Sequence, residues 1–302
     1  MFSVESRWGH QHSIHVEWNI GKRCNLDCAY CPAEIHDNFS PHTPLPTMIN
    51  TIYMLEDLRK SIRLSLTGGE PTVHPDISEI LQCASARLDW VSVTTNGLRP
   101  SEWYINQPVN QWVFSIHFDN DLIYKAAENV VRYSQLLDME GKDTLFQVNL
   151  MCHHEHMDQV KEVANLLEGH HVPYVCRRIR WTSADDRDYF DDMRYKEKDL
   201  EWILSKTATV KANCVIDKEH KVHANDIIKH KWNQFEGWQC NAGLESLMIN
   251  WDGDVHRATC RVGGSLGNIY QGTFEPPQDP IICTRKWCTC AADIPLTKVN
   301  EQ

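Results

Sequence analysis

Three cysteines near the start of the chain are spaced so that their thiolates can meet around one metal centre. The segment CNLDCAYC places Cys24, Cys28 and Cys31 in a C-x3-C-x2-C array. Four cysteines would close a tetrahedral zinc site or saturate a four-iron cluster, whereas three leave one iron of such a cluster open to another ligand. An open iron can bind a reactant, so the array indicates redox chemistry. A zinc knuckle or a chance grouping among the twelve cysteines is the alternative.

A glycine-rich element follows about one βα unit later and adds a second chemical feature. The sequence Gly68-Gly69-Glu70-Pro71-Thr72 comes directly after the alternating run Ile62, Leu64, Leu66, which predicts a strand that ends at this point. Two glycines let backbone approach a ligand that a side chain would block. The Glu70 carboxylate and the neighbouring backbone carbonyls then suit an ammonium group.

The cysteine array, with the aromatic Tyr30 before its third cysteine, and the GGEP element together resemble the radical S-adenosylmethionine (radical SAM) superfamily. The resemblance implies a [4Fe-4S] cluster on the three cysteines, whose open iron chelates the methionine end of S-adenosylmethionine. It further implies that the cofactor is held by Gly68, Gly69 and Glu70 at its amino group, and by Tyr30 at its adenine. Covering the cluster is the simpler role for the tyrosine. An external electron donor such as flavodoxin or ferredoxin is an implied partner.

Beyond these motifs, short β-rich runs alternate with helical stretches, which is typical of βα units around a parallel sheet. The expected helices cover 48–60, 76–87, 122–139 and 157–168, and the expected strands cover 13–20, 61–66, 90–94, 112–117, 144–151 and 172–178. Six units are fewer than the eight of a closed barrel. The fold class is therefore α/β, and the resemblance implies a partial (βα)6 TIM-like barrel with a small C-terminal cysteine-rich domain.

Polar residues at the ends of the later strands are further candidates, because reactive groups of parallel α/β folds collect there. Ser115 and His117 close the fourth expected strand, Asn149 lies near the end of the fifth, and Arg178 and Arg180 close the sixth. The resemblance implies that they hold the ribose and the carboxylate of the cofactor. A barrel histidine hydrogen-bonded to backbone is the alternative for His117.

Two cysteines also fall near strand ends. Cys152 and Cys176 could exchange a hydrogen atom during radical chemistry, or they could be buried packing residues. The run Cys152-His153-His154-Glu155-His156 has the composition of a metal site, but consecutive residues of a strand or helix point in different directions. A polar loop that leads into a helix is the expectation for this run.

Five further cysteines gather in the last quarter of the chain. A reducing compartment disfavours disulfides and five is an odd number, so we expect a metal or cluster site with one spare thiol. The run from Ile249 to Val255 predicts a hairpin that turns at Asp252-Gly253. The order resembles the twitch domain, a shortened SPASM extension with one auxiliary [4Fe-4S] cluster, while a four-cysteine zinc ribbon is the competing site. The candidate ligands are Cys240, Cys260, Cys283, Cys288 and Cys290; which two of the last three bind is open.

Composition and charge bound the remaining possibilities. We expect the barrel in residues 1–182, a charged, partly helical connector in 183–238 and the auxiliary domain in 239–302. The formal net charge of −11 argues against a nucleic-acid groove. No apolar stretch approaches the roughly 20 residues that cross a bilayer, and the start of the chain lacks a secretory pattern. A cytoplasmic protein is expected.

The resemblance implies an enzyme that cleaves S-adenosylmethionine reductively and removes a hydrogen atom from a substrate, for net oxidation or bond formation. About twenty residues precede Cys24, too few for the peptide-binding domain of many peptide maturases. This favours a small molecule, or a peptide delivered by a separate protein. The alternatives are a non-catalytic iron–sulfur or zinc protein and an RNA-modifying radical SAM enzyme, and the acidic balance counts against the latter.

Overall fold

The computed structural model describes residues 3–4, 13–58, 60–179, 194–206, 214–217, 220–222, 227, 231–288, 290 and 292–300. The expectation for Arg180 and about half of the connector 183–238 lie outside these residues. Within the connector, helix α6 (Glu197–Ser205) is present as expected.

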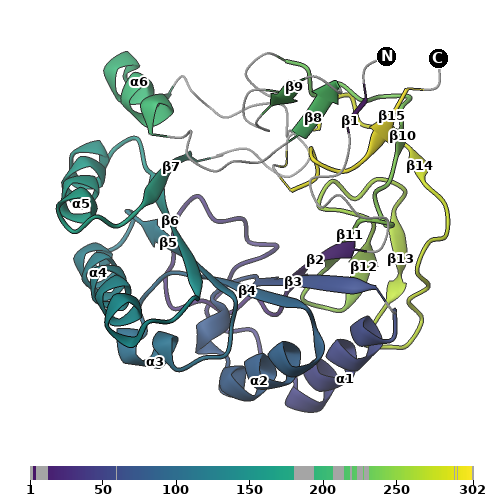
Figure 1. The fold of residues 1–302 in the computed structure, drawn as a ribbon, viewed down its shortest axis with the longest axis horizontal. Coiled ribbons are helices and arrows are strands. Elements are labelled where there is room, and N and C mark those ends of the chain that lie inside the picture. Colours follow the sequence, from purple (N-terminus) through teal and green to yellow (C-terminus); the bar gives the residue numbers. More distant parts are fainter. Residues whose placement is uncertain are drawn as a thin grey trace.

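Six parallel strands form an arc that is open on one side (Figure 1). Neighbours along the chain pair with each other throughout the arc. Each expected strand is present, with bounds close to those predicted, which confirms an α/β fold built as a partial, TIM-like barrel. The strands are β2 (Ser13–Asn19), β3 (Ser61–Thr67), β4 (Trp90–Thr95), β5 (Gln111–His117), β6 (Leu145–Cys152) and β7 (Tyr174–Arg178).

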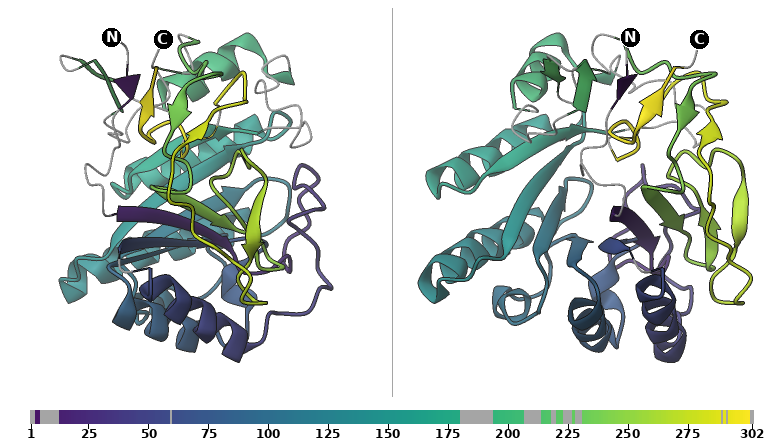
Figure 2. Two further views of the ribbon diagram at one scale, coloured as in Figure 1. Left: turned by 90° about the vertical axis from the view of Figure 1, so that its right-hand side faces the viewer. Right: turned by 45° about the vertical axis from the view of Figure 1, so that its right-hand side comes forward.

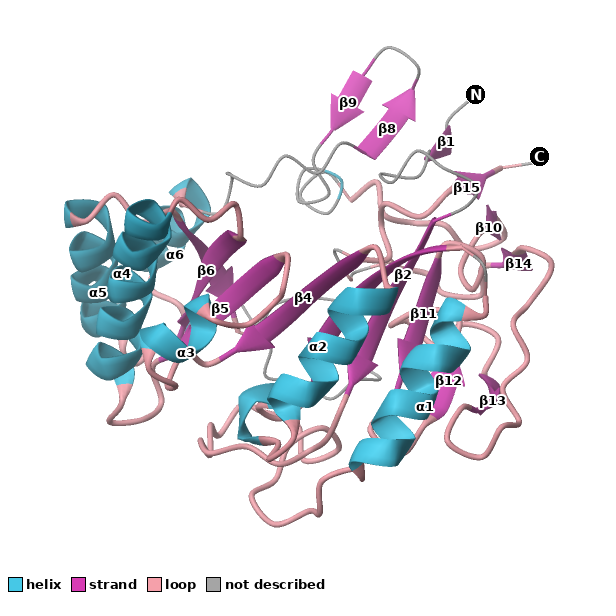
Figure 3. Ribbon diagram, turned by 60° about the horizontal axis from the view of Figure 1, so that its bottom comes forward, coloured by secondary structure: helices cyan, strands magenta, loops and turns pink. Residues whose placement is uncertain are grey.

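Helices cover the outer face of this arc, and Figure 3 shows α1 and α2 lying across the sheet. The alternation in β3 explains the layering, because Ile62 and Leu64 are buried against the helices while Ser65 faces the inside of the arc. Among the described residues, no helix combines the length and the apolar character needed to cross a membrane. The helices are α1 (Leu45–Glu56), the 3-10 turn η1 (Pro71–Val73), α2 (Ile77–Arg87), α3 (Ser101–Ile105), α4 (Ile123–Glu140) and α5 (Met157–Gly169).

The C-terminal segment extends the barrel sheet at its β2 edge. Strand β11 (Ser246–Ile249) pairs in parallel with β2, and β12 (Asp254–His256) and β13 (Ser265–Asn268) continue the sheet in antiparallel order (Figure 2). The β11–β12 hairpin turns through residues 250–253, as the sequence predicted. The cysteine-rich region is therefore held directly against the first strand of the barrel.

A second, small sheet joins the two ends of the described chain. It runs β1 (Ser3–Val4), β15 (Lys298–Val299), β10 (Gln239–Cys240) and β14 (Ile281–Ile282), and β8 (Cys214–Asp217) and β9 (His220–Val222) form a separate pair. Figure 1 shows β1 and β15 side by side beyond the open side of the arc.

Candidate functional site

The loop between β2 and α1, which carries the three N-terminal cysteines, is closed by its own backbone. The N–H of Cys24 donates to the carbonyl of Asp37 at 2.8 Å, and the N–H of Asp37 donates to the carbonyl of Lys22 at 2.9 Å. The Lys22 ammonium also pairs with the Asp37 carboxylate at 3.2 Å. His36 Nε2 lies 2.7 Å from the Leu26 carbonyl. These contacts fix the start of the loop to its end, so the cysteines are held in one place.

The three thiols share an environment that favours binding of a cationic group. Burial raises the pKa of Cys24 and of Cys31 to about 11. Burial raises the pKa of Cys28 to about 12, and the two neighbouring thiols add to this shift. A raised pKa means that the surrounding protein does not stabilise the thiolate form that metal ligation requires. A bound cationic cluster would supply the missing positive charge. Three sulfur ligands on one short loop fit a [4Fe-4S] cluster that keeps one iron open.

The glycine turn after β3 packs directly on the start of the cysteine loop. The N–H of Gly69 donates to the carbonyl of Gly21 at 2.8 Å, and the N–H of Glu70 donates to that of Arg23 at 2.8 Å. A Cβ on Gly69 would lie only 2.2 Å from the carbonyl oxygen of Lys22. The missing side chain thus makes room for the loop backbone, a packing role that the sequence did not show. Cofactor contacts of Gly68 and Gly69 stay a prediction.

The Glu70 carboxylate is 4% exposed and ties the end of β3 to the end of β4. Its Oε1 accepts hydrogen bonds from the N–H and hydroxyl of Thr72, at 2.9 and 2.6 Å, and from the hydroxyl of Thr95 at 2.8 Å. Its Oε2 accepts from the N–H of Asn96 at 2.6 Å. Burial raises the pKa of Glu70, and these hydrogen bonds oppose the shift. A carboxylate offers about four lone-pair sites, so Oε2 can accept one further donor such as an ammonium group.

We expect Glu70→Gln to loosen this junction. A glutamine amide replaces one acceptor oxygen by an NH2 group, which leaves at least one buried donor unpaired at a cost of about 1–3 kcal/mol. Thermal unfolding of the metal-free protein should show this as a melting temperature lower by roughly 2–10 °C. Glu79→Gln, at an exposed position of α2, is the matched control and should change little. Equal melting temperatures for the two variants would contradict this role of Glu70.

Tyr30 contacts two histidines at the ends of β5 and β6. Its hydroxyl lies 2.5 Å from Nδ1 of His117, and the two rings stack with centroids 6.0 Å apart at 19°. On another side the His153 ring lies at 6.0 Å. Burial and the nearby His36 lower the pKa of His117 to about 4, so the neutral imidazole accepts the Tyr30 hydroxyl proton. The side-chain partner of His117 is therefore Tyr30, and not backbone as in the alternative expected for this residue.

A row of polar groups crosses the inner face of β5, β6 and β7. Ser115 and Asn149 are paired in register, and Asn149 Oδ1 accepts from Arg177 Nε at 3.2 Å and from Gln147 Nε2 at 2.7 Å. Register also places Arg178 on the face opposite to Asn149, beside the core. The sequence selected Arg178 and missed Arg177 because a strand end can be located from the pattern, whereas the face of two adjacent arginines cannot.

Cys152 and Cys176 lie in the main hydrophobic core between the sheet and the helices. Both are completely buried, and the Cys152 thiol donates to the Leu150 carbonyl at 3.3 Å. Cys176 is paired in register with Leu150, so it also faces the helices. This placement contradicts the prediction that the two thiols exchange hydrogen with a substrate and agrees with the packing alternative.

Four of the five C-terminal thiols gather in a second, smaller core. Burial raises the pKa of each of Cys240, Cys260 and Cys288, and each of these thiols has further cysteines of the group among its electrostatic neighbours. The members of this four-thiol group are Cys240, Cys283 and Cys288, which are buried, and Cys260, which is partly buried against them.

Cys290 is not among the described residues that make up the second core. Burial raises the pKa of its thiol to about 12, and the charges that add most to this shift are Asp293 and Glu17. Glu17 belongs to β2 of the barrel, where burial and Asp293 raise its own pKa to about 7. Cys290 therefore has a charged group of the barrel, Glu17, among its neighbours, and the choice of the spare thiol stays a prediction.

Lys298 supplies a buried positive charge beside the four-thiol group. It is 1% exposed, and its Nζ donates to three backbone carbonyls of residues 293–296 at 2.7 to 3.1 Å. It is paired in register with Cys240. Burial alone lowers the pKa of Lys298, but the nearby thiols of Cys288 and Cys240 raise it above its ordinary value. A protonated lysine here offsets the negative charge that four thiolate ligands would bring.

The C-terminal thiols do not form a compact group of the kind that a single metal ion requires. Among the described residues, no three cysteine sulfurs lie within 4.8 Å of one another. The sulfurs of a tetrahedral zinc site, with Zn–S near 2.3 Å, are about 3.8 Å apart. The choice between a cluster and a zinc ion at these thiols therefore stays a prediction.

Comparison with known proteins gives one family and several relatives. Residues 18–167 match the family model described as the radical SAM superfamily. Molybdenum cofactor biosynthesis protein 1 of Drosophila melanogaster is 36% identical over 99 residues, which cover 29% of this chain and 16% of that protein. A probable GTP 3',8-cyclase of Methanocaldococcus jannaschii is 32% identical over 81 residues, which cover 26% of this chain and 27% of that protein. The matches thus span less than a third of these relatives.

Solved structures share the fold over most of the chain. SuiB of Streptococcus suis bound to S-adenosylmethionine superposes with a TM-score of 0.55 at 14% identity, covering 86% of this chain and 64% of that one. The anSMEcpe enzyme with bound AdoMet gives 0.51 at 12% identity, covering 85% and 78%. At such identities the likeness concerns the fold alone, and it agrees with the partial barrel.

Proposed function

This chain belongs to the radical SAM superfamily, and we propose that it is an enzyme that cleaves S-adenosylmethionine reductively and abstracts hydrogen from a substrate, for net oxidation or bond formation. The observation that carries the proposal is the cysteine loop clamped to the turn after β3. This contact brings three sulfur ligands and a carboxylate with spare acceptor capacity to one point at the C-terminal ends of the strands.

The residues of the loop and the turn would hold the cofactors. Cys24, Cys28 and Cys31 would ligate a [4Fe-4S] cluster, and Glu70 with the adjacent backbone would accept the ammonium group of S-adenosylmethionine. When bound, the cluster and S-adenosylmethionine together supply a 5'-deoxyadenosyl radical, which is the chemistry the protein itself does not perform. The chain contributes placement, exclusion of water and the charge around the thiolates.

The polar row of the inner face would orient the cofactor or the substrate. Arg177 is fixed by Asn149, and a guanidinium binds a carboxylate through a planar fork of donors. Ser115 and Asn149 offer hydroxyl and amide groups on the same face, which suit ribose hydroxyls. The neutral His117 keeps Tyr30 over the cysteine loop, where its ring would pack against the adenine.

The C-terminal region would hold a second cluster, as in a twitch-like domain. We propose Cys240, Cys260, Cys283 and Cys288 as its ligands, with Lys298 as the buried countercharge. Such a cluster would supply an acceptor for the electron that an oxidised substrate gives up. Strand β11 attaches this region to β2 of the barrel, while Cys240 itself lies in the small second sheet.

Cys288 and Cys290 are two residues apart in the sequence, and we expect their serine variants to differ in iron content. Cys288→Ser is expected to lower the iron content by up to about four per chain, because it removes a ligand of the four-thiol group. Cys290→Ser is expected to leave the iron content unchanged, because that thiol is not part of the four-thiol group. Iron and sulfide assays on both variants after anaerobic reconstitution check this assignment. Iron loss in Cys290→Ser with a full complement in Cys288→Ser would reverse it.

The substrate is proposed only by class, as a small molecule or a peptide. SuiB has been solved bound to the precursor peptide SuiA, and anSMEcpe bound to the Cp18Cys peptide, which keeps a peptide among the candidates. The curated relatives named as GTP 3',8-cyclases match too little of their length to transfer a substrate. We further propose that the protein works in the reducing cytoplasm, where flavodoxin or ferredoxin would deliver the electron to the first cluster.

The first test is reductive cleavage by the reconstituted protein. Dithionite or a flavodoxin system is added to the iron-loaded chain with S-adenosylmethionine, and 5'-deoxyadenosine is measured. Formation of 5'-deoxyadenosine supports the enzyme. Zinc in place of iron, or no cleavage with either reductant, would leave a non-catalytic metal-binding protein.

A further inference from the structure

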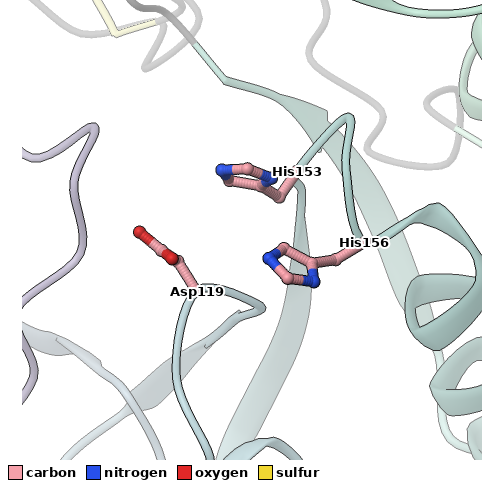
Figure 4. Close-up of side chains that lie close together, drawn as sticks. All are labelled: Asp119, His153 and His156. Carbon is pink, nitrogen blue, oxygen red and sulfur yellow. The ribbon is translucent and has the colours of Figure 1, made fainter.

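Three side chains at the ends of β5 and β6 converge outside the cysteine sites (Figure 4). Asp119 follows β5, His153 follows β6, and His156 directly precedes α5. One ligand atom from each residue lies within 4.8 Å of those from the other two, and the residue His153 is 3% exposed. Among the described residues, no other group of three histidine, cysteine or acidic side chains has its ligand atoms this close together.

The convergence comes from a tight turn and from strand pairing. The N–H of His156 donates to the carbonyl of His153 at 3.0 Å, so residues 153–156 fold back and bring the two imidazoles to the same side, with ring centroids 4.8 Å apart. Strand β5 pairs in parallel with β6, which sets Asp119 beside this turn. The rule that consecutive residues diverge, which disfavoured a metal site in this run, does not apply to residues three apart across a turn.

Neighbouring groups already orient two of the three side chains. Nδ1 of His156 lies 3.0 Å from the Gln159 side-chain oxygen, which accepts its N–H and leaves the lone pair on Nε2. Such a second contact is typical of metal-binding histidines. The Oδ2 atom of Asp119 accepts the N–H of Ala29 at 2.7 Å, and a carboxylate so held retains acceptor capacity for a cation.

The third side chain requires one adjustment. Nδ1 of His153 accepts the N–H of Glu155 at 3.3 Å, a long hydrogen bond. Coordination through Nε2 would put the ring proton on Nδ1 and replace that contact. The exchange gives up a weak hydrogen bond for a metal–nitrogen bond.

We propose that Asp119, His153 and His156 bind one divalent first-row metal ion, of the class of Mn²⁺, Fe²⁺, Co²⁺ and Zn²⁺. Two imidazoles and one carboxylate are a borderline donor set that suits these ions, and three protein ligands leave coordination positions for water or for an oxygen or nitrogen of a bound molecule. The ligands include no cysteine, so this metal site does not rest on the proposed radical chemistry.

The position of this site links it to the cysteine loop. Ala29, whose N–H is held by Asp119, lies between Cys28 and Cys31. Tyr30, the next residue, contacts His153. A metal ion that fixes Asp119 and His153 would therefore also restrain the loop.

Mn²⁺ is the probe of choice, because it prefers oxygen and nitrogen over thiolate ligands. The cluster-loaded, oxidised chain is titrated with Mn²⁺, and free ion is followed by its EPR signal. We expect one Mn²⁺ per chain with nitrogen hyperfine coupling. Asp119→Asn and His156→Gln should each weaken binding at least about tenfold, and Gln159→Ala should weaken it less. The matched control is Glu155→Gln, an exposed carboxylate in the same turn, which should bind as the unchanged chain does.

Two results would overturn the proposal. One is the lack of a bound, nitrogen-coupled Mn²⁺ in the folded chain, and the other is equal affinity in Asp119→Asn, His156→Gln and Glu155→Gln. Melting curves of each variant verify folding. If a ligand variant unfolds, the Mn²⁺ affinity of Gln159→Ala, which keeps all three ligands, tests the site instead. Cleavage of S-adenosylmethionine is measured on the same samples. Cleavage without Mn²⁺ binding overturns only this site, and Mn²⁺ binding without cleavage overturns only the proposed function.

Discussion

Replacing Cys24, Cys28 and Cys31 together by alanine is expected to abolish 5'-deoxyadenosine formation and to lower the iron content from about eight to about four per chain. The three thiols lie on one loop. That loop is closed by backbone hydrogen bonds and by the ion pair of Lys22 with Asp37, and not by the cysteine side chains. The loop should therefore persist without its sulfur ligands, and the C-terminal cysteines should still load. The loss is then specific to one cluster.

The measurement is iron, sulfide and 5'-deoxyadenosine on the reconstituted variant. Cys83→Ala serves as the control, because this half-buried cysteine of α2 packs against the main core, away from both cysteine groups. It should keep the full iron content and the full rate. Retained cleavage in the triple variant, or loss of all iron from it, would contradict the assignment of the first cluster to this loop.

Gly69→Ala is expected to have the second largest effect, on both stability and iron loading. The added Cβ would lie 2.2 Å from the carbonyl oxygen of Lys22 and 2.3 Å from that of Arg23. Both are backbone atoms, which cannot rotate away as a side chain would. The turn after β3 must then separate from the cysteine loop, which breaks the hydrogen bonds from Gly69 to Gly21 and from Glu70 to Arg23. We expect a loss of about 2–4 kcal/mol.

Gly21→Ala provides a matched control within the same contact. A Cβ on Gly21 would meet no atom within 4 Å, so this variant should stay within about 1 kcal/mol of the unchanged chain. Melting temperature of the metal-free protein and iron content after reconstitution are compared for the two alanine variants. If Gly69→Ala and Gly21→Ala melt together and load equally, the turn does not support the loop as described.

The sequence determined most of the barrel. Alternating runs such as Ile62, Leu64 and Leu66 predicted the strands, because a strand that buries one face must repeat every two residues. The C-x3-C-x2-C array and the GGEP element were sufficient to predict one cluster loop and one strand end, since each is a local pattern of residues close in the chain. The hairpin at residues 250–253 was equally local.

Only the tertiary structure distinguishes residues of the same type that lie close together in the sequence. Cys288 belongs to the four-thiol group, whereas Cys290 has Glu17 of β2 among its electrostatic neighbours, a residue from the other end of the chain. Arg177 replaces Arg178 on the inner face because of the register between β6 and β7. In both pairs the residue types are identical, so only packing separates them.

The group of Asp119, His153 and His156 shows the same division most clearly. Its histidines are visible in the sequence, but its carboxylate comes from the end of another strand, and a turn between β6 and α5 aligns the imidazoles. Composition and short spacings determined which chemical groups this chain has and on which strands they lie. The register of parallel strands and the burial of their outer faces decided which of those groups meet, because these depend on contacts between residues far apart in the chain.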